Sequence, residues 1–109
     1  MTVSWAYIFE QPGADPAADR VVIDGGGQRT FLVPVPEPSM AAQAASALLK
    51  EGVELIELCG GFNLATAAEV VTAVGNRVPV GHVTFAVDSV RGAAAYGERF
   101  ESEQAGVTT

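Results

Sequence analysis

The sequence predicts a single α/β domain built on one layer of mainly parallel sheet, with helices packed on it. Short apolar runs rich in β-branched and aromatic residues are typical of strands. From about residue 36 these runs alternate with helical patterns, which favours parallel strands joined by right-handed crossovers. The 109 residues suffice for one hydrophobic core. We therefore expect residues 1–101 to form the domain in the order β-β-β-α-β-α-β-α, with a disordered polar tail over residues 102–109.

The first third of the chain predicts three strands. Residues 3–9 resemble a buried strand, and residues 11–19 form a loop with two prolines and a glycine. Residues 29–35 form the next main strand. Residues 21–24 can pair with it as a hairpin through Gly25–Gly27. Whether this short strand joins the main sheet of about four strands stays open.

The remaining elements alternate. They are a helix from Glu37 to Gly52, a strand over 53–58, a helix from Asn63 to Gly75, a strand over 79–87 and a helix from Asp88 or Ser89 to Glu101. Asn63 is a favourable N-cap, and Gly52 and Gly75 suit helix ends. The last helix carries one apolar stripe, namely Val90, Ala94, Gly97 and Phe100.

The charge balance disfavours two kinds of partner. The net charge is -7, from 13 acidic and 6 basic side chains. Nucleic acids and anionic membranes both bind cationic surfaces, so neither is expected as a partner.

The apolar content and the cysteine count indicate how the protein assembles and where in the cell it is found. Nearly half of the residues are hydrophobic, which favours a homo-oligomer. Cys59 is the only cysteine, so no intramolecular disulfide can form. With no signal-like N-terminus and no long apolar run, a cytoplasmic location is expected.

A site is expected where the carboxyl ends of the parallel strands meet helix N-termini. The predicted substrate-binding residues there are Gly60, Gly61, Phe62, Asn63, Asp88 and Ser89. Adjacent glycines allow close backbone approach to a ligand, and free amides suit an anion or an oxyanion. The alternative is a tight, well-capped turn with no ligand, and Asp88 is alternatively a simple helix cap.

Glu57 and Cys59 are the candidate catalytic residues. Glu57 interrupts an apolar strand, and strand alternation puts it on the same face as Cys59. A carboxylate there suits acid–base chemistry, or else it pairs with Arg20, Arg29 or Arg91. Cys59 is alternatively a small core residue.

His82 is predicted near the start of its strand, closer to Glu54 than to Cys59, so a Cys–His pair is not expected. Its role stays open. With one His and one Cys, no metal site is expected. Lys50 is the only lysine and lies at a helix end, so Schiff-base chemistry is not expected, and no cofactor is assigned.

Three segments together resemble a family of short bacterial proteins of unknown function. They are AYIFEQPGADP (residues 6–16), EGVELIELCGGF (residues 51–62, with an ELCGGF core) and VPVGHVTFAVDSV (residues 78–90). The resemblance covers residues 6–100 and implies no particular reaction. It implies a functional loop containing Pro12–Gly13, Asp15 and Arg20. Family members often carry a His beside that Arg, where this chain has Asp19.

The hypothesis from sequence is a small, cofactor-independent isomerase, lyase or cyclase acting on an anionic or carbonyl-bearing metabolite. Glu57 would transfer protons, Arg20 would orient the substrate, and the Gly60–Asn63 amides would stabilise negative charge. The alternatives are a non-catalytic small-molecule-binding module and an assembly subunit.

Overall fold

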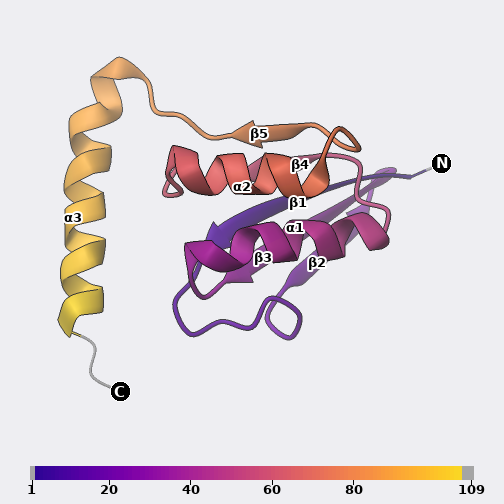
Figure 1. Ribbon diagram of the computed structural model, residues 1–109, viewed down its shortest axis with the longest axis horizontal. Coiled ribbons are helices and arrows are strands. Elements are labelled where there is room, and N and C mark those ends of the chain that lie inside the picture. Colours follow the sequence, from indigo (N-terminus) through magenta and orange to yellow (C-terminus); the bar gives the residue numbers. More distant parts are fainter. Residues whose placement is uncertain (1, 107–109) are drawn as a thin grey trace.

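The computed structural model describes residues 2–106 and contains the predicted order of strands and helices (Figure 1). The strands are β1 (Val3–Glu10), β2 (Val21–Gly25), β3 (Gln28–Val35), β4 (Ile56–Leu58) and β5 (Val80–His82). The α-helices are α1 (Ala41–Lys50), α2 (Leu64–Val74) and α3 (Val90–Gly106). Two short 3₁₀ turns, η1 (Pro38–Met40) and η2 (Val87–Ser89), precede α1 and α3. The predicted α/β class is confirmed.

The strands form one mixed, mostly parallel sheet in the order β2-β3-β1-β4-β5. β1 pairs in parallel with both β3 and β4, and β4 pairs in parallel with β5. β2 forms one edge and is antiparallel to β3, to which it is joined by a turn in which Gly26 and Gly27 have φ of 60° and 79°. The hairpin strand therefore does join the main sheet.

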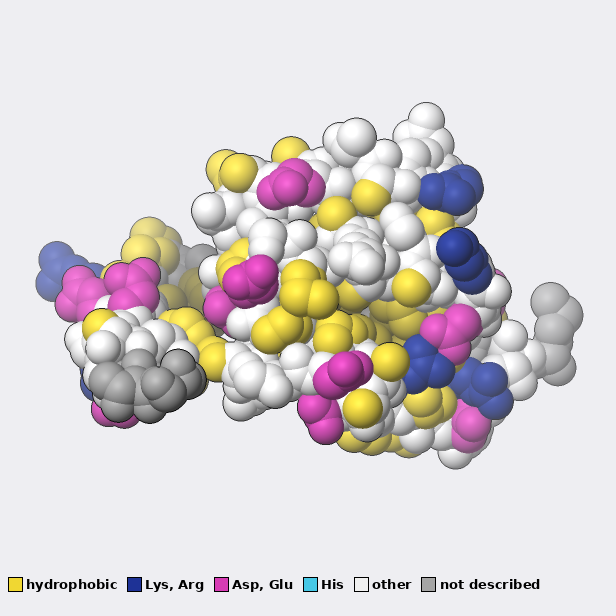
Figure 2. Space-filling view, turned by 60° about the horizontal axis from the view of Figure 1, so that its bottom comes forward, with side chains coloured by type: hydrophobic (Ala, Val, Ile, Leu, Met, Phe, Trp, Pro, Cys, Tyr) yellow, Lys and Arg dark blue, Asp and Glu magenta, His cyan; other side chains and the backbone are white. Residues whose placement is uncertain are grey.

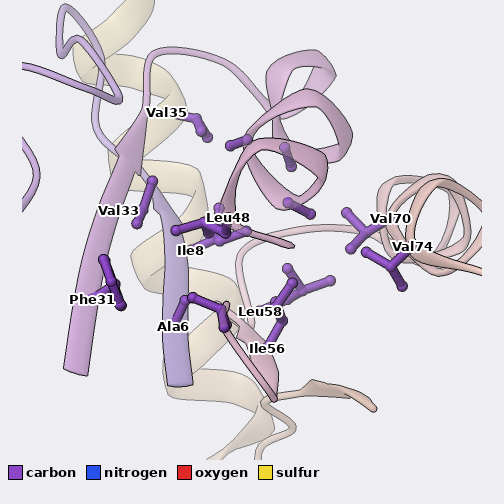
Figure 3. Packing of buried hydrophobic residues seen from close by; sticks show 14 of the residues in the cluster. Ala6, Ile8, Phe31, Val33, Val35, Leu48, Ile56, Leu58, Val70 and Val74 are labelled. Atoms are coloured by element: carbon purple, nitrogen blue, oxygen red, sulfur yellow. The ribbon is translucent and has the colours of Figure 1, made fainter. Parts of the chain in front are cut away.

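α1 and α2 cover one face of the sheet (Figure 1). The β3–α1–β4 and β4–α2–β5 connections run in the same direction across the sheet, so right-handed crossovers place both helices on the same side. The core lies between them and the strands (Figure 3). Its fully buried side chains include Ile8, Val35, Ile56, Leu58, Val70 and Val74.

The opposite face of the sheet carries no α1 or α2. β1 and β3 are parallel, and a helix connecting them would have covered this second face. The chain instead forms the antiparallel edge strand β2 between them, so no helix is placed there by this connection. Strand alternation places half-buried Trp5, Tyr7 and Phe9 on it, between the buried Ala6 and Ile8 of the helix-covered face. We call this side the open face. It also carries Val21 and Ile23 of β2, Leu32 of β3 and Glu57 of β4.

Two strands are shorter than predicted. β4 covers only Ile56–Leu58 of the expected residues 53–58, although Glu54 still donates its N–H to the Ser4 carbonyl oxygen. β5 ends at His82 instead of Val87. The Val83 N–H still bonds the Leu58 carbonyl oxygen at 3.0 Å, and after that the chain leads away from the sheet.

α3 stands beside the rest of the molecule (Figures 1 and 2). None of its 17 residues is buried. It was expected to end at Glu101, but it continues to Gly106, so residues 102–106 of the predicted tail are helical. Residues 107–109 lie outside the described residues.

Candidate functional site

Tyr7 and Glu57 lie side by side on the open face. They are register partners in the parallel β1–β4 pair, so their strands are about 4.8 Å apart at this point. Glu57 is exposed, whereas its neighbours Ile56 and Leu58 are buried on the helix-covered face. A Cβ added to Gly81, its partner in β5, would lie 3.6 Å from Glu57 Cγ. This is an ordinary van der Waals distance, so Glu57 lies beside Gly81 without requiring a glycine there.

Cys59 joins this pair just beyond the end of β4. Its N–H donates to the Ile8 carbonyl oxygen at 3.0 Å, which holds the residue against β1. The Gly61 N–H donates to Cys59 Sγ at 3.5 Å, and the Tyr7 hydroxyl donates to the same sulfur. The structure therefore brings both predicted catalytic residues into contact range of Tyr7, which sequence reasoning did not select.

The surroundings raise the pKa of Tyr7 to about 12. Partial burial has the largest effect, followed by the hydrogen bond with Cys59 and then by the negative charges of Cys59 and Glu57. Tyr7, like an ordinary tyrosine, is protonated at neutral pH, and the raised pKa extends the pH range over which it can donate a hydrogen bond.

An open hollow of about 420 Å³ lies further along β1, and its lining includes Phe9 but none of the three residues of the trio. Phe9 lies in its wall and stacks on Tyr7, with ring centroids 6.1 Å apart. Pro12 and Gly13 of the loop implied by the resemblance also line it. The hollow lies at the carboxyl ends of β1 and β3, whose onward connections run in opposite directions, and this is where ligands bind in open α/β sheets.

The turn over Gly60–Asn63 is shaped largely by packing. A Cβ at Gly60 would lie 3.0 Å from both Phe85 Cε2 and the Val83 carbonyl oxygen, so glycine is needed for protein contacts. Phe62 is buried in the core. Asn63 Oδ1 accepts the Thr66 N–H at 2.8 Å, as expected of an N-cap.

The amides of this turn do not form an open cradle. The Phe62 N–H donates to the Cys59 carbonyl oxygen at 3.1 Å, and the Gly61 N–H is directed at Cys59 Sγ. The expected set of free Gly60–Asn63 amides is therefore not present, because two of them bond within the turn.

Arg20 is not brought to Glu57. Its guanidinium makes two 2.6 Å hydrogen bonds to the Glu51 carboxylate and lies 5.2 Å from the centre of the Phe31 ring. Phe31 belongs to the helix-covered face, so Arg20 lies on the wrong side of the sheet. The hydrogen bond from Arg20 lowers the pKa of Glu51.

Other proposed partners of the site are also placed elsewhere. Arg29 pairs with Asp24 at 2.7 Å. Asp15 accepts the amides of Ala18 and Ala17, and these hydrogen bonds lower its pKa and hold the first loop in shape. Asp88 and Ser89 belong to η2, which the chain reaches only after leaving the sheet (Figure 1).

The predicted position of His82 is wrong. It lies at the end of β5 as the register partner of Leu58, one residue from Cys59 and not near Glu54. The error came from extending β5 to Val87. His82 Nε2 lies 2.9 Å from the Phe62 carbonyl oxygen, on the helix-covered side, so the ring braces the start of α2 and does not face Cys59.

A second hollow, of about 610 Å³, lies at the opposite edge of the sheet. Lys50, Glu54 and Arg77 line it, but the Arg77 guanidinium already donates to the carbonyl oxygens that end α2. Within residues 2–106, no group of three His, Cys, Asp or Glu side chains is placed to hold a metal ion. In the same described part, no helix is long and apolar enough to cross a bilayer.

These features define a two-layer α/β domain with one uncovered sheet face and, on that face, the cluster of Tyr7, Glu57 and Cys59. The chain belongs to a family of unknown function (DUF6506), whose model matches residues 3–98. The family membership inferred from sequence is thus confirmed. No curated protein and no solved structure matches the chain.

Proposed function

We propose that the protein is a small cofactor-independent enzyme of the isomerase, lyase or cyclase type. The observation that carries this proposal is the trio of Tyr7, Glu57 and Cys59 on adjacent strands of the open face. A proton acceptor beside a neutral hydroxyl donor is the minimum needed to move a proton next to a carbonyl group.

Glu57 acts as the base in this mechanism. Its carboxylate takes a proton from the carbon beside the carbonyl of the substrate, and the electron pair of that C–H bond moves onto the carbonyl oxygen. The Tyr7 hydroxyl, which is protonated at neutral pH, turns from Cys59 Sγ to the substrate and donates its hydrogen bond to that developing oxyanion. Glu57 then returns the proton to another atom of the substrate. Cys59 lines the site and accepts the hydrogen bond of the Tyr7 hydroxyl when no substrate is bound.

The substrate is a small carbonyl compound bound beside Phe9. The 420 Å³ hollow offers a wall of Phe9, Pro12 and Pro34 next to Tyr7. Because Arg20 is paired with Glu51, we favour a neutral carbonyl over an anionic substrate group.

The test is proton exchange in heavy water. The protein is incubated with a panel of small ketones, aldehydes and keto acids, and NMR follows loss of the carbon-bound protons. Glu57→Gln should reduce the exchange rate by at least about 100-fold, the range of general-base catalysis, while ligand-induced shifts persist. Glu69→Gln, an exposed carboxylate on α2, is the matched control. Exchange by the wild type that survives Glu57→Gln would exclude Glu57 as the base.

A non-catalytic binding module is the second candidate. The lining of the hollow favours this candidate because its ionisable side chain, Asp19, is already engaged in the loop. The Asp19 carboxylate accepts the Asp15 N–H at 2.7 Å. In that case panel compounds would shift Phe9 and Gly13 resonances without any exchange, and Glu57→Gln would leave the binding unchanged.

The proposal also includes self-association in the cytoplasm. A lone thiol such as Cys59 is suited to a reducing compartment.

A further inference from the structure

The open face presents an apolar row over β2, β3 and β1, and neither α1 nor α2 lies on this side of the sheet. Val21, Leu32, Tyr7, Glu57 and Gly81 are successive register partners across all five strands. At the β2 edge, Val21 and Ile23 are 51% and 55% exposed. Exposed apolar surface of this extent usually marks an interaction site.

α3 carries an apolar stripe that none of the other described residues buries. Val90, Ala94, Gly97 and Phe100 lie on one side of it, and none of them is buried. Val90 remains 50% exposed, and nearby Tyr96 is 65% exposed. A helix this exposed owes little stability to packing, although packing supplies most helix stability in proteins.

The exit from β5 directs α3 away from its own sheet. The Val83 N–H bonds the Leu58 carbonyl oxygen, and Phe85 packs against Gly60. These contacts fix residues 83–85 at the carboxyl edge, so α3 begins beyond the sheet (Figure 1). The chain thus carries an open face and a helix that could cover it but does not.

The surface area fits a missing interface. The chain exposes 7072 Å², whereas a compact protein of this mass exposes about 5,700 Å². Its radius of gyration is 14.7 Å, against about 13 Å for a compact chain of this length. An excess on the order of 1,000 Å² per chain is what a stable homodimer buries.

We infer that two copies form a twofold dimer in which α3 of each copy packs across the open face of the other. The dimensions agree, because the 17 residues of α3 span about 25 Å and five strands are about 24 Å wide. A second copy supplies both a helix and a face, so the contact is self-complementary and closed.

The dimer would also complete the proposed site. The helix of the partner lies over Tyr7, Glu57 and Cys59 and turns the open trio into an enclosed pocket, where hydrogen bonds to a developing charge are stronger. The assembly itself does not depend on Glu57 being catalytic, so the tests of the two proposals are independent.

The first test is the mass in solution, measured by sedimentation velocity and light scattering. The full chain should sediment as a dimer of 11.2 kDa subunits over a wide range of concentrations. Val90→Glu should weaken dimerisation at least about tenfold, while the acidic residue in the first turn remains compatible with the helix. Val71→Glu is the control, since Val71 is an exposed valine on α2. A monomeric wild type would overturn the inference and leave the face to a different partner.

The second test uses the single native thiol. A variant that carries both Ala94→Cys and Cys59→Ser is mixed with the wild-type protein. The two proteins are refolded together and treated with a short bismaleimide. Covalent dimers should form in the mixture and not in either protein alone. Arg99→Cys with Cys59→Ser, on the far side of α3, is the control. Dimers that cross-link equally in both mixtures would show that the copies meet through another surface.

Discussion

Tyr7 shows how one side chain changes its chemistry through its neighbours. It lies on a half-buried strand face, beside a carboxylate and a thiol that both disfavour a second negative charge. Its pKa is therefore raised from 10.0 to about 12. The folded state binds the Tyr7 proton more tightly than the unfolded chain does. The resulting stabilisation is fully present below pH 10 and is lost as the pH rises through about 12.

This pKa can be measured directly. The chain has two tyrosines, so Tyr96→Phe leaves Tyr7 as the only source of tyrosinate absorbance. We expect a midpoint near 12 while circular dichroism shows that the fold persists. Adding Cys59→Ser should lower the midpoint, because it removes the thiolate charge and replaces the hydrogen-bond acceptor. A midpoint of 10 in the folded Tyr96→Phe protein would mean that Tyr7 does not face the trio.

At the scale of elements, the turn from β4 into α2 supports the chain that leads to α3. Gly60→Ala would place its new Cβ 3.0 Å from the Val83 carbonyl oxygen, and a backbone atom cannot move aside cheaply. We expect a loss of about 1–3 kcal/mol in the free energy of unfolding, as for other overpacked sites. Urea denaturation measures it. Gly61→Ala is the matched control, because its nearest neighbour is Cys59 Sγ at 3.8 Å. Equal losses in the two variants would show that Phe85 and Val83 are not packed on Gly60.

The elements that sequence predicted well are those with strong local signals. Gly52 and Gly75 end α1 and α2 with φ of +86° and +61°, and Asn63 caps α2 as expected. Glu57 and Cys59 were selected because alternation along a strand is local. Tyr7 was missed because its position beside them depends on the β1–β4 register, which pairs residues 50 positions apart.

The errors also have physical causes. β5 was extended to Val87 because residues 83–87 are apolar or β-branched, yet their packing on Gly60 takes them out of the sheet. Arg20 was placed at the site because the family resemblance implied a functional loop there, and its ion pair with Glu51, 31 residues away, leaves no local signal in the sequence. Correct predictions for β5 and Arg20 would have required knowledge of tertiary contacts, which a single sequence does not provide.

At the scale of the whole molecule, covering the open face should make stability depend on protein concentration. If folding and dimerisation are coupled, mass action adds about 1.4 kcal/mol for each tenfold rise in concentration. With an unfolding entropy of roughly 2.1 cal/mol/K per residue over two chains, this corresponds to a Tm increase of about 3 °C. Differential scanning calorimetry at several concentrations measures it. Val90→Glu, which weakens the helix-to-face contact, should melt at a lower temperature and with a flatter concentration dependence. If the wild type stays dimeric but its Tm does not change with concentration, dimerisation is not coupled to unfolding. The contact made by α3 would then contribute little to the stability of the sheet.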